Sequence, residues 1–144
     1  MSQRFVQFID VEDLADWIVN AGAAGVTGVV NAVGEAHTMH DFFRAARSVA
    51  GFDGELITVD DEELLALDVH YWAGPRSLPL WLPIEAVGFA QRAGSAFVAT
   101  GGRSRPLADT LTRVLTDEIS RGLDRPRRSG LTTDEEQEVL AAAR

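Results

Sequence analysis

The sequence predicts a mixed α/β fold, with a small sheet and about five helices. Residues 5–9, Phe-Val-Gln-Phe-Ile, are rich in the aromatic and β-branched side chains that favour a strand. Apolar residues then recur at helical spacing from residue 11 to residue 21. Strand-like and helix-like segments alternate in the same way as far as residue 67, which is typical of α/β proteins.

Length and composition fit a chain that buries one sizeable core and binds neither nucleic acid nor an anionic membrane. The chain has 144 residues, of which 46% are hydrophobic. Its net charge of -9 and its pI near 4.7 oppose the neutralisation of phosphates. The absence of cysteine excludes disulfides and thiolate metal sites, and no apolar run is long enough to span a membrane. Because the start, Met-Ser-Gln-Arg, lacks a signal-peptide pattern, we expect a cytoplasmic protein.

The first strand and the first helix are joined at Asp10. The Asp10 carboxylate can accept hydrogen bonds from the free backbone N-H groups of a helix start, and Asp13 adds negative charge near the positive end of the helix dipole. We therefore expect the helix to begin directly after Asp10. Its apolar stripe consists of Val11, Leu14, Ala15, Ile18 and Ala21.

Residues 7–15 have the order Gln-Phe-Ile-Asp-Val-Glu-Asp-Leu-Ala. This order resembles a signature of the extended short-chain dehydrogenases/reductases, the NAD-dependent epimerases and dehydratases. In that family the signature follows the cofactor-binding Rossmann domain and introduces the C-terminal, substrate-binding portion. The resemblance implies that this chain corresponds to the substrate-binding portion. NAD or NADP would then be bound by a Rossmann domain that this chain lacks.

Residues 22–28, Gly-Ala-Ala-Gly-Val-Thr-Gly, have the glycine spacing of a nucleotide-binding loop. A small nucleotide-binding domain would need a strand over residues 17–20 and a helix from Gly28 onward. Against this alternative, the first helix already includes residues 17–20, and consecutive valines and Gly34 make a poor helix. We expect a helix stop and a loop, followed by a strand over residues 28–33. The family typically shows Gly-Val-x-Asn-x-x-Gly here, a match that makes Asn31 a candidate substrate-binding residue.

Thr38 is the expected N-cap of the second helix, which Gly51 ends. Asp41 supplies a capping-box acid, and the family carries a similar Thr-x-x-Asp/Glu-Leu/Phe motif. The apolar side of the helix consists of Met39, Phe42, Phe43, Ala46, Val49 and Ala50. His37 and His40 have the spacing of a metal-binding pair, but no third ligand follows nearby. We expect two polar residues at a solvated helix start and no metal.

All 13 basic residues are arginine, which excludes several mechanisms. A P-loop and a Schiff-base enzyme both need lysine, and the dehydrogenase family needs the pair Tyr-x-x-x-Lys. The single tyrosine, Tyr71, is followed by Trp-Ala-Gly-Pro. We therefore expect neither a catalytic residue nor a bound cofactor in this chain.

The middle of the chain predicts a strand over residues 55–59 and a short acidic helix over residues 61–67. The acids at this helix start fit a solvated cap, with a carboxylate metal site as the minor alternative. Residues 70–83 form an aromatic loop that prolines keep irregular. Large apolar side chains on such a loop either fill a core or line a ligand pocket. A variable loop in this region lines the substrate cavity of the family, so Trp72 and Trp81 are candidate substrate-binding residues.

Helical turns are expected over residues 86–97, and Pro106 suits the first position of a longer helix. Arginines oppose the dipole at a helix start unless both share an anion, so Arg103 and Arg105 are candidate ligands of an anionic substrate group. In sugar-nucleotide epimerases of the family, an arginine just before a Pro-Leu pair contacts the nucleotide diphosphate, and Arg105 has this position. The family has a second arginine at the position that Val6 occupies here. This difference departs from the pattern of a nucleotide-sugar site.

The predicted domains are a substrate-side α/β domain at residues 1–121, a linker at 122–130 and a C-terminal helix at 131–144, opened by a capping box. The first functional hypothesis is the substrate-binding portion of an epimerase/dehydratase-type reductase, whose small-molecule substrate could carry an anionic group. The alternative is a stand-alone small-molecule-binding or protein-interaction module without catalysis. Open strand edges predict pairing with the missing Rossmann domain or with a second copy, as a homo-oligomer.

Overall fold

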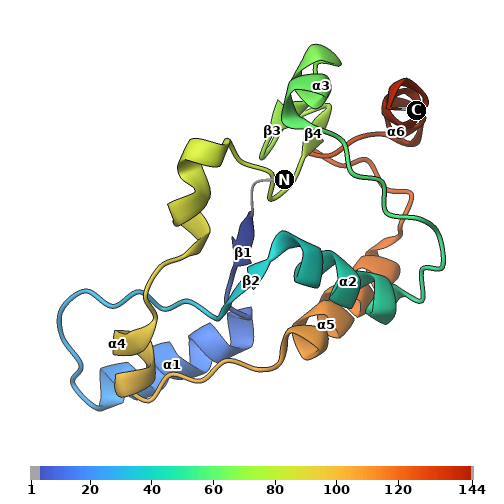
Figure 1. Cartoon of the computed structure of the whole chain (residues 1–144). Helices are drawn as coiled ribbons and strands as arrows, with labels where there is room; N and C mark the ends of the chain where they lie inside the picture. Colours follow the sequence, from blue (N-terminus) through green and yellow to red (C-terminus); the bar gives the residue numbers. More distant parts are fainter. Residues whose placement is uncertain (1–3, 144) are drawn as a thin grey trace. The chain divides into compact units, whose positions relative to one another are not determined.

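The protein is described by a computed structural model that covers residues 4–143. Over these residues it contains six α-helices, one 3-10 helix and four short strands, which confirms the mixed α/β class (Figure 1). The strands form two separate two-stranded sheets. The chain divides into two compact units: unit 1 ends at Phe52 and resumes over Ile84–Arg121, and unit 2 consists of Asp53–Pro83 and the chain from Gly122 onward.

The sheet of unit 1 pairs β1 (Phe5–Gln7) with β2 (Ala36–Thr38) in antiparallel register. The central residue of β1, Val6, is buried. The side chain of Gln7 donates to the carbonyls of Gly34 at 3.0 Å and Arg92 at 2.9 Å, and it accepts from the Arg92 backbone N-H at 2.8 Å. One amide side chain therefore holds two loops beside β1, because it satisfies backbone groups from both.

Helix α1 (Val11–Ala23) follows β1, as predicted. Asp10 is its N-cap and accepts from the Glu12 N-H at 2.9 Å. Trp17 packs edge-on against Phe97 of α4 (Ser95–Ala99), with ring centroids 5.5 Å apart, and its indole N-H donates to Thr100. Residues 17–20 are helical and no helix begins at Gly28, so the strand and helix that the nucleotide-binding alternative needs are not formed, and the predicted loop is confirmed.

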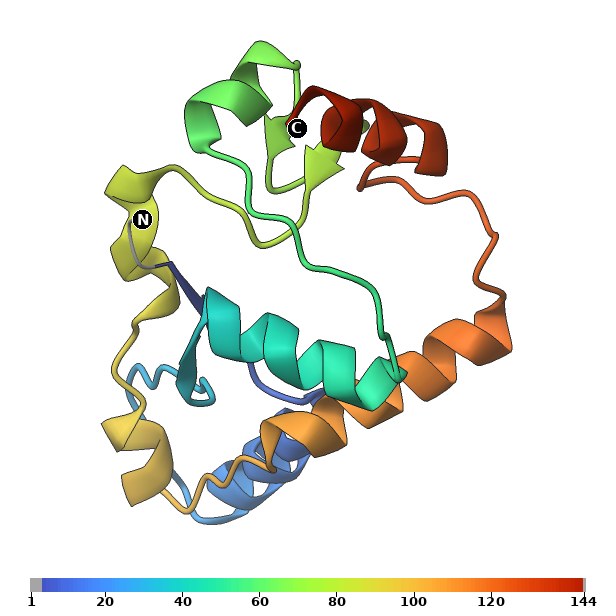
Figure 2. The same ribbon diagram turned by 45° about the vertical axis from the view of Figure 1, so that its right-hand side comes forward.

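Helices α2 (Met39–Ala50) and α5 (Leu107–Arg121) lie side by side within unit 1 (Figures 1 and 2). Thr38 caps α2 by accepting from the Asp41 N-H at 3.1 Å, and Gly51 ends the helix in the left-handed conformation, as predicted. The predicted start of α5 at Pro106 is also confirmed within one residue. A 3-10 helix, η1 (Ile84–Ala90), precedes α4, so the predicted helical turns over residues 86–97 are interrupted.

Unit 2 contains α3 (Asp61–Ala66), β3 (His70–Tyr71), β4 (Ser77–Leu78) and α6 (Thr133–Ala142). The two short strands are parallel. The buried core of unit 2 consists of Leu64, Val69, Trp81 and Val139, so residues 53–83 pack with the C-terminal helix. The predicted capping box of α6 is confirmed, because Thr132 and Glu135 bond each other's backbone N-H groups.

Two predicted strands are wrong. Residues 28–33 are irregular, and the partner of β1 lies further along, at residues 36–38. Val29 is 97% exposed, so its β-branched side chain gains no burial that would stabilise a strand. Residues 55–59 are also irregular, and Leu56 and Ile57 are exposed. Within residues 4–143, no helix is both long and apolar enough to cross a membrane.

Candidate functional site

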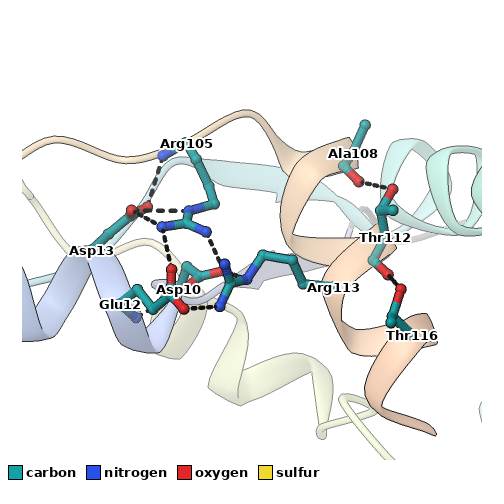
Figure 3. Close-up of polar contacts among 8 residues, drawn as sticks. All are labelled: Asp10, Glu12, Asp13, Arg105, Ala108, Thr112, Arg113 and Thr116. Atoms are coloured by element: carbon teal, nitrogen blue, oxygen red, sulfur yellow. Dashed lines mark hydrogen bonds and ion pairs between the residues drawn. The ribbon is translucent and has the colours of Figure 1, made fainter. Parts of the chain in front are cut away.

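A cluster of carboxylates and guanidinium groups joins the start of α1 to the start of α5 (Figure 3). Asp13 accepts three hydrogen bonds from Arg105: one from the backbone N-H at 2.8 Å, one from Nε at 2.9 Å and one from Nη2 at 2.7 Å. Bonds of this kind, between charged groups, are stronger than neutral ones. The pair therefore fixes both the main chain and the side chain of Arg105.

Two further acids and a second arginine complete this cluster. Arg105 also lies 3.5 Å from Asp10 and 3.4 Å from Glu12. Arg113, in the second turn of α5, contacts the Glu12 carboxylate and lies 3.5 Å from Asp10. We call Asp10, Glu12, Asp13, Arg105 and Arg113 the acid-arginine cluster. It contains three carboxylates and two guanidinium groups.

The contacts of the acid-arginine cluster favour the charged forms of Glu12, Asp13, Arg105 and Arg113. The hydrogen bond from Arg105 lowers the pKa of Asp13, and the hydrogen bond from Arg113 lowers the pKa of Glu12, in both cases against the effect of burial. The same contacts raise the pKa of Arg105 and Arg113. The three acids thus offer their oxygens mainly to the two arginines.

A cavity of about 310 Å³ lies beside the cluster, within unit 1. This volume is at the lower end of the range for small-molecule sites. Its walls come from the turn after β1, from the segment before β2 and from the start of α5. The lining residues are Phe8, Ile9, Asp10, Asp13, Gly34, Glu35, His37, Ser104, Arg105, Pro106, Leu107 and Thr110.

Gly34 is required where the wall of the cavity approaches β1. Its backbone N-H donates to the Phe8 carbonyl at 3.0 Å, and a Cβ atom at this position would overlap that same carbonyl oxygen. Only glycine permits such a close approach. The glycine that ends the Gly-Val-x-Asn-x-x-Gly match therefore has a structural role at the cavity.

The five predicted site residues lie in different places. Arg105 lines the cavity, while Arg103 and Asn31 are exposed and do not. Trp81 is buried in the core of unit 2, where its indole N-H donates to Asp61 at 3.1 Å and its ring lies 4.0 Å from that of Tyr71. Trp72 is 44% exposed in unit 2, with a backbone φ of 67°. Of these residues, the cavity therefore contains Arg105 alone.

Sequence reasoning missed most of the polar lining of the cavity. Glu35, Ser104 and Thr110 carry no local motif, and their proximity follows from the packing of α5 and the loop before β2. The Asp13–Arg105 pair, by contrast, could be suspected from the sequence. An arginine opposes the dipole at the start of the helix after Pro106, and Asp13 adds negative charge at the start of the first helix. His37 lines the cavity, whereas the exposed His40 lies 3.8 Å from Asp41. Over residues 4–143, no three side chains of metal-binding type form a group that could hold a metal ion.

No family model, no curated protein and no solved structure matches this chain. The function is therefore inferred from the residues and their geometry.

Proposed function

We propose that this chain is the substrate-binding portion of an NAD(P)-dependent epimerase/dehydratase-type reductase. One observation supports the proposal most strongly. Two of the segments that resemble the family, residues 7–15 and 105–107, are separated by about ninety residues of sequence, yet both line one cavity. A concave site with convergent polar groups is the usual form of a small-molecule site.

In this proposal these 144 residues bind and orient the substrate, and the chemistry belongs to a separate Rossmann domain. The chain contains no lysine, and Tyr71, its single tyrosine, packs against Trp81 in unit 2. NAD or NADP would be bound by the separate domain. Arg105 forms part of the wall of that substrate cavity, where Asp13 fixes its backbone and side chain.

A second candidate function, a protein-interaction module, is favoured by the surface of α1. Val11 and Val19 are more than 70% exposed, and Ile18 is 54% exposed. Exposed apolar side chains gathered on one helix are typical of a surface that another protein covers. The partner in this case is a Rossmann domain or a second copy of this chain.

Ligand binding in the cavity can be tested by NMR with a chemically diverse fragment library. We expect bound fragments to shift the amide resonances of residues 34–37 and 104–110. Ser104→Trp should abolish these shifts by filling the cavity, and the matched variant Ser120→Trp, at an exposed position of α5, should leave them unchanged. Calorimetry with NAD and NADP should detect no binding. If no fragment shifts these amides, the protein-interaction function would be preferred.

A further inference from the structure

The charged groups at the cavity differ in how many of their atoms already have hydrogen-bond or ion-pair partners within the chain. Both oxygens of Asp13 accept from Arg105, and the Asp10 carboxylate accepts from the Glu12 N-H and lies 3.5 Å from both arginines. Arg105 directs its Nε, Nη1 and Nη2 atoms at carboxylates of the same chain. An anionic ligand would therefore have to displace one of three carboxylates from the guanidinium group.

Four other polar side chains line the cavity without a partner. Among residues 4–143, Thr110, Ser104, His37 and Glu35 form no side-chain hydrogen bond or ion pair, although all four line the cavity. Thr110 is the least exposed of them, at 8%. Its hydroxyl group has no partner within the described residues yet keeps contact with solvent at the cavity, so a ligand there can reach it.

The chemistry of these four groups indicates what that ligand carries. An ionised carboxylate only accepts hydrogen bonds, both hydroxyl groups can accept them, and a neutral imidazole accepts at one nitrogen. The cavity is lined by three carboxylates and one guanidinium group, so its net charge is negative. A ligand that donates several hydrogen bonds and carries positive charge satisfies both conditions.

We propose that the cavity binds a small organic cation, through an ammonium group held by Glu35, Thr110 and Ser104. This inference rests on the proposed function, since it names the class of substrate for the same cavity. An ammonium group provides three hydrogen-bond donors and no acceptor, which matches the free groups. The apolar wall formed by Phe8, Ile9 and Leu107 fits the carbon chain of such a ligand.

NMR titrations with three linear probes of four carbons each test the proposal. Putrescine is a diamine, butanediol is its neutral counterpart and succinate is its anionic counterpart. At about 0.15 M salt, which screens non-specific attraction to this acidic protein, only putrescine should shift the amides of residues 34–37 and 104–110. Glu35→Gln should weaken putrescine about fivefold, as expected for one exposed ion pair. Thr110→Val should weaken it by a similar factor through loss of the hydroxyl group.

Controls separate this inference from the proposed function. Glu85→Gln removes the same charge from an exposed residue of unit 1 that does not line the cavity, and it should leave putrescine affinity unchanged. Circular dichroism verifies that each variant is folded. If succinate or butanediol shifts the cavity amides and putrescine does not, the cationic class is overturned while substrate binding at the cavity stands. If fragments of the diverse library bind there and all three probes fail, the inference is overturned in the same way.

Discussion

Asp13 and Arg105 are ninety-two positions apart in the sequence and share three hydrogen bonds. These bonds connect α1, the first helix of the chain, to the segment just before α5. They also keep the Arg105 side chain at the rim of the cavity. A single carboxylate therefore contributes both to the stability of unit 1 and to the geometry of the candidate site.

The lowered pKa of Asp13 predicts a specific dependence of stability on pH. Its ordinary pKa is 3.8, and Arg105 lowers this value in the folded protein. The contribution to stability is fully present above the unfolded pKa and is lost as the pH falls through the folded pKa. Urea unfolding should therefore show a steeper loss of stability below about pH 4 in the wild type than in Asp13→Asn.

The matched control for this pH series is Asp16→Asn, at an exposed position of α1. It should keep the wild-type dependence on pH. Equal slopes in the wild type and in Asp13→Asn would contradict the stabilising role of the Asp13–Arg105 pair.

Gly102 supports a second prediction for a single residue. A Cβ atom at Gly102 would overlap the ring of Phe97, which is 1% exposed and packs against Trp17. Gly102→Ala should therefore reduce the free energy of unfolding by about 1–3 kcal/mol, the usual cost of overpacking a core. Gly88→Ala is the control, since a Cβ at Gly88 would meet nothing within 4 Å. A Gly102→Ala protein as stable as the control would contradict this packing.

Helix starts that depend on nearby residues could be predicted from the sequence. Strand pairing and the lining of the cavity depend on distant residues and could not. Asp10, Thr38 and Thr132 mark helix starts because a side chain caps the backbone within three residues of itself. Residues 28–33 have strand-like composition, but a strand needs a hydrogen-bonded neighbour, and β1 pairs with residues 36–38 instead. The polar lining of the cavity depends on the same kind of long-range packing.

The cap of α2 gives a prediction for one element. Thr38 accepts from the Asp41 N-H at 3.1 Å and donates to the Asp41 carboxylate at 2.7 Å. Thr38→Ala should reduce the free energy of unfolding by about 1 kcal/mol, because the backbone N-H loses its partner. Thr38→Ser keeps the hydroxyl group and should remain within a few tenths of a kcal/mol of the wild type. Chemical denaturation measures both, and equal stability of the two variants would contradict the cap.

The organisation of the whole molecule into two units had no signal in the sequence. In the sequence, residues 53–83 lie between the two segments of unit 1. Leu64, Val69 and Trp81 nevertheless pack with Val139 near the end of the chain. Contacts between residues so far apart depend on the folded topology and leave no periodic pattern. The candidate site, in contrast, lies wholly within unit 1.

The surface of unit 1 predicts that this chain self-associates. Within the described residues, β1 and β2 have only each other as sheet neighbours, so one edge of each strand has no strand paired to it. Val11 and Val19 of α1 are 74% and 71% exposed. Open strand edges and exposed apolar side chains both favour association with another chain. We therefore expect a homodimer or a larger homo-oligomer at low micromolar concentration.

Sedimentation velocity tests this expectation with two matched variants. Val19→Glu places a charge on the exposed surface of α1 and should shift the protein toward monomer, because burying an unpaired charge in an interface is costly. Val29→Glu adds the same charge to an exposed loop position outside α1 and should leave the oligomer intact. A wild-type monomer that binds no dye specific for exposed apolar surface would contradict the prediction. It would favour a stand-alone module that buries its apolar residues without a partner.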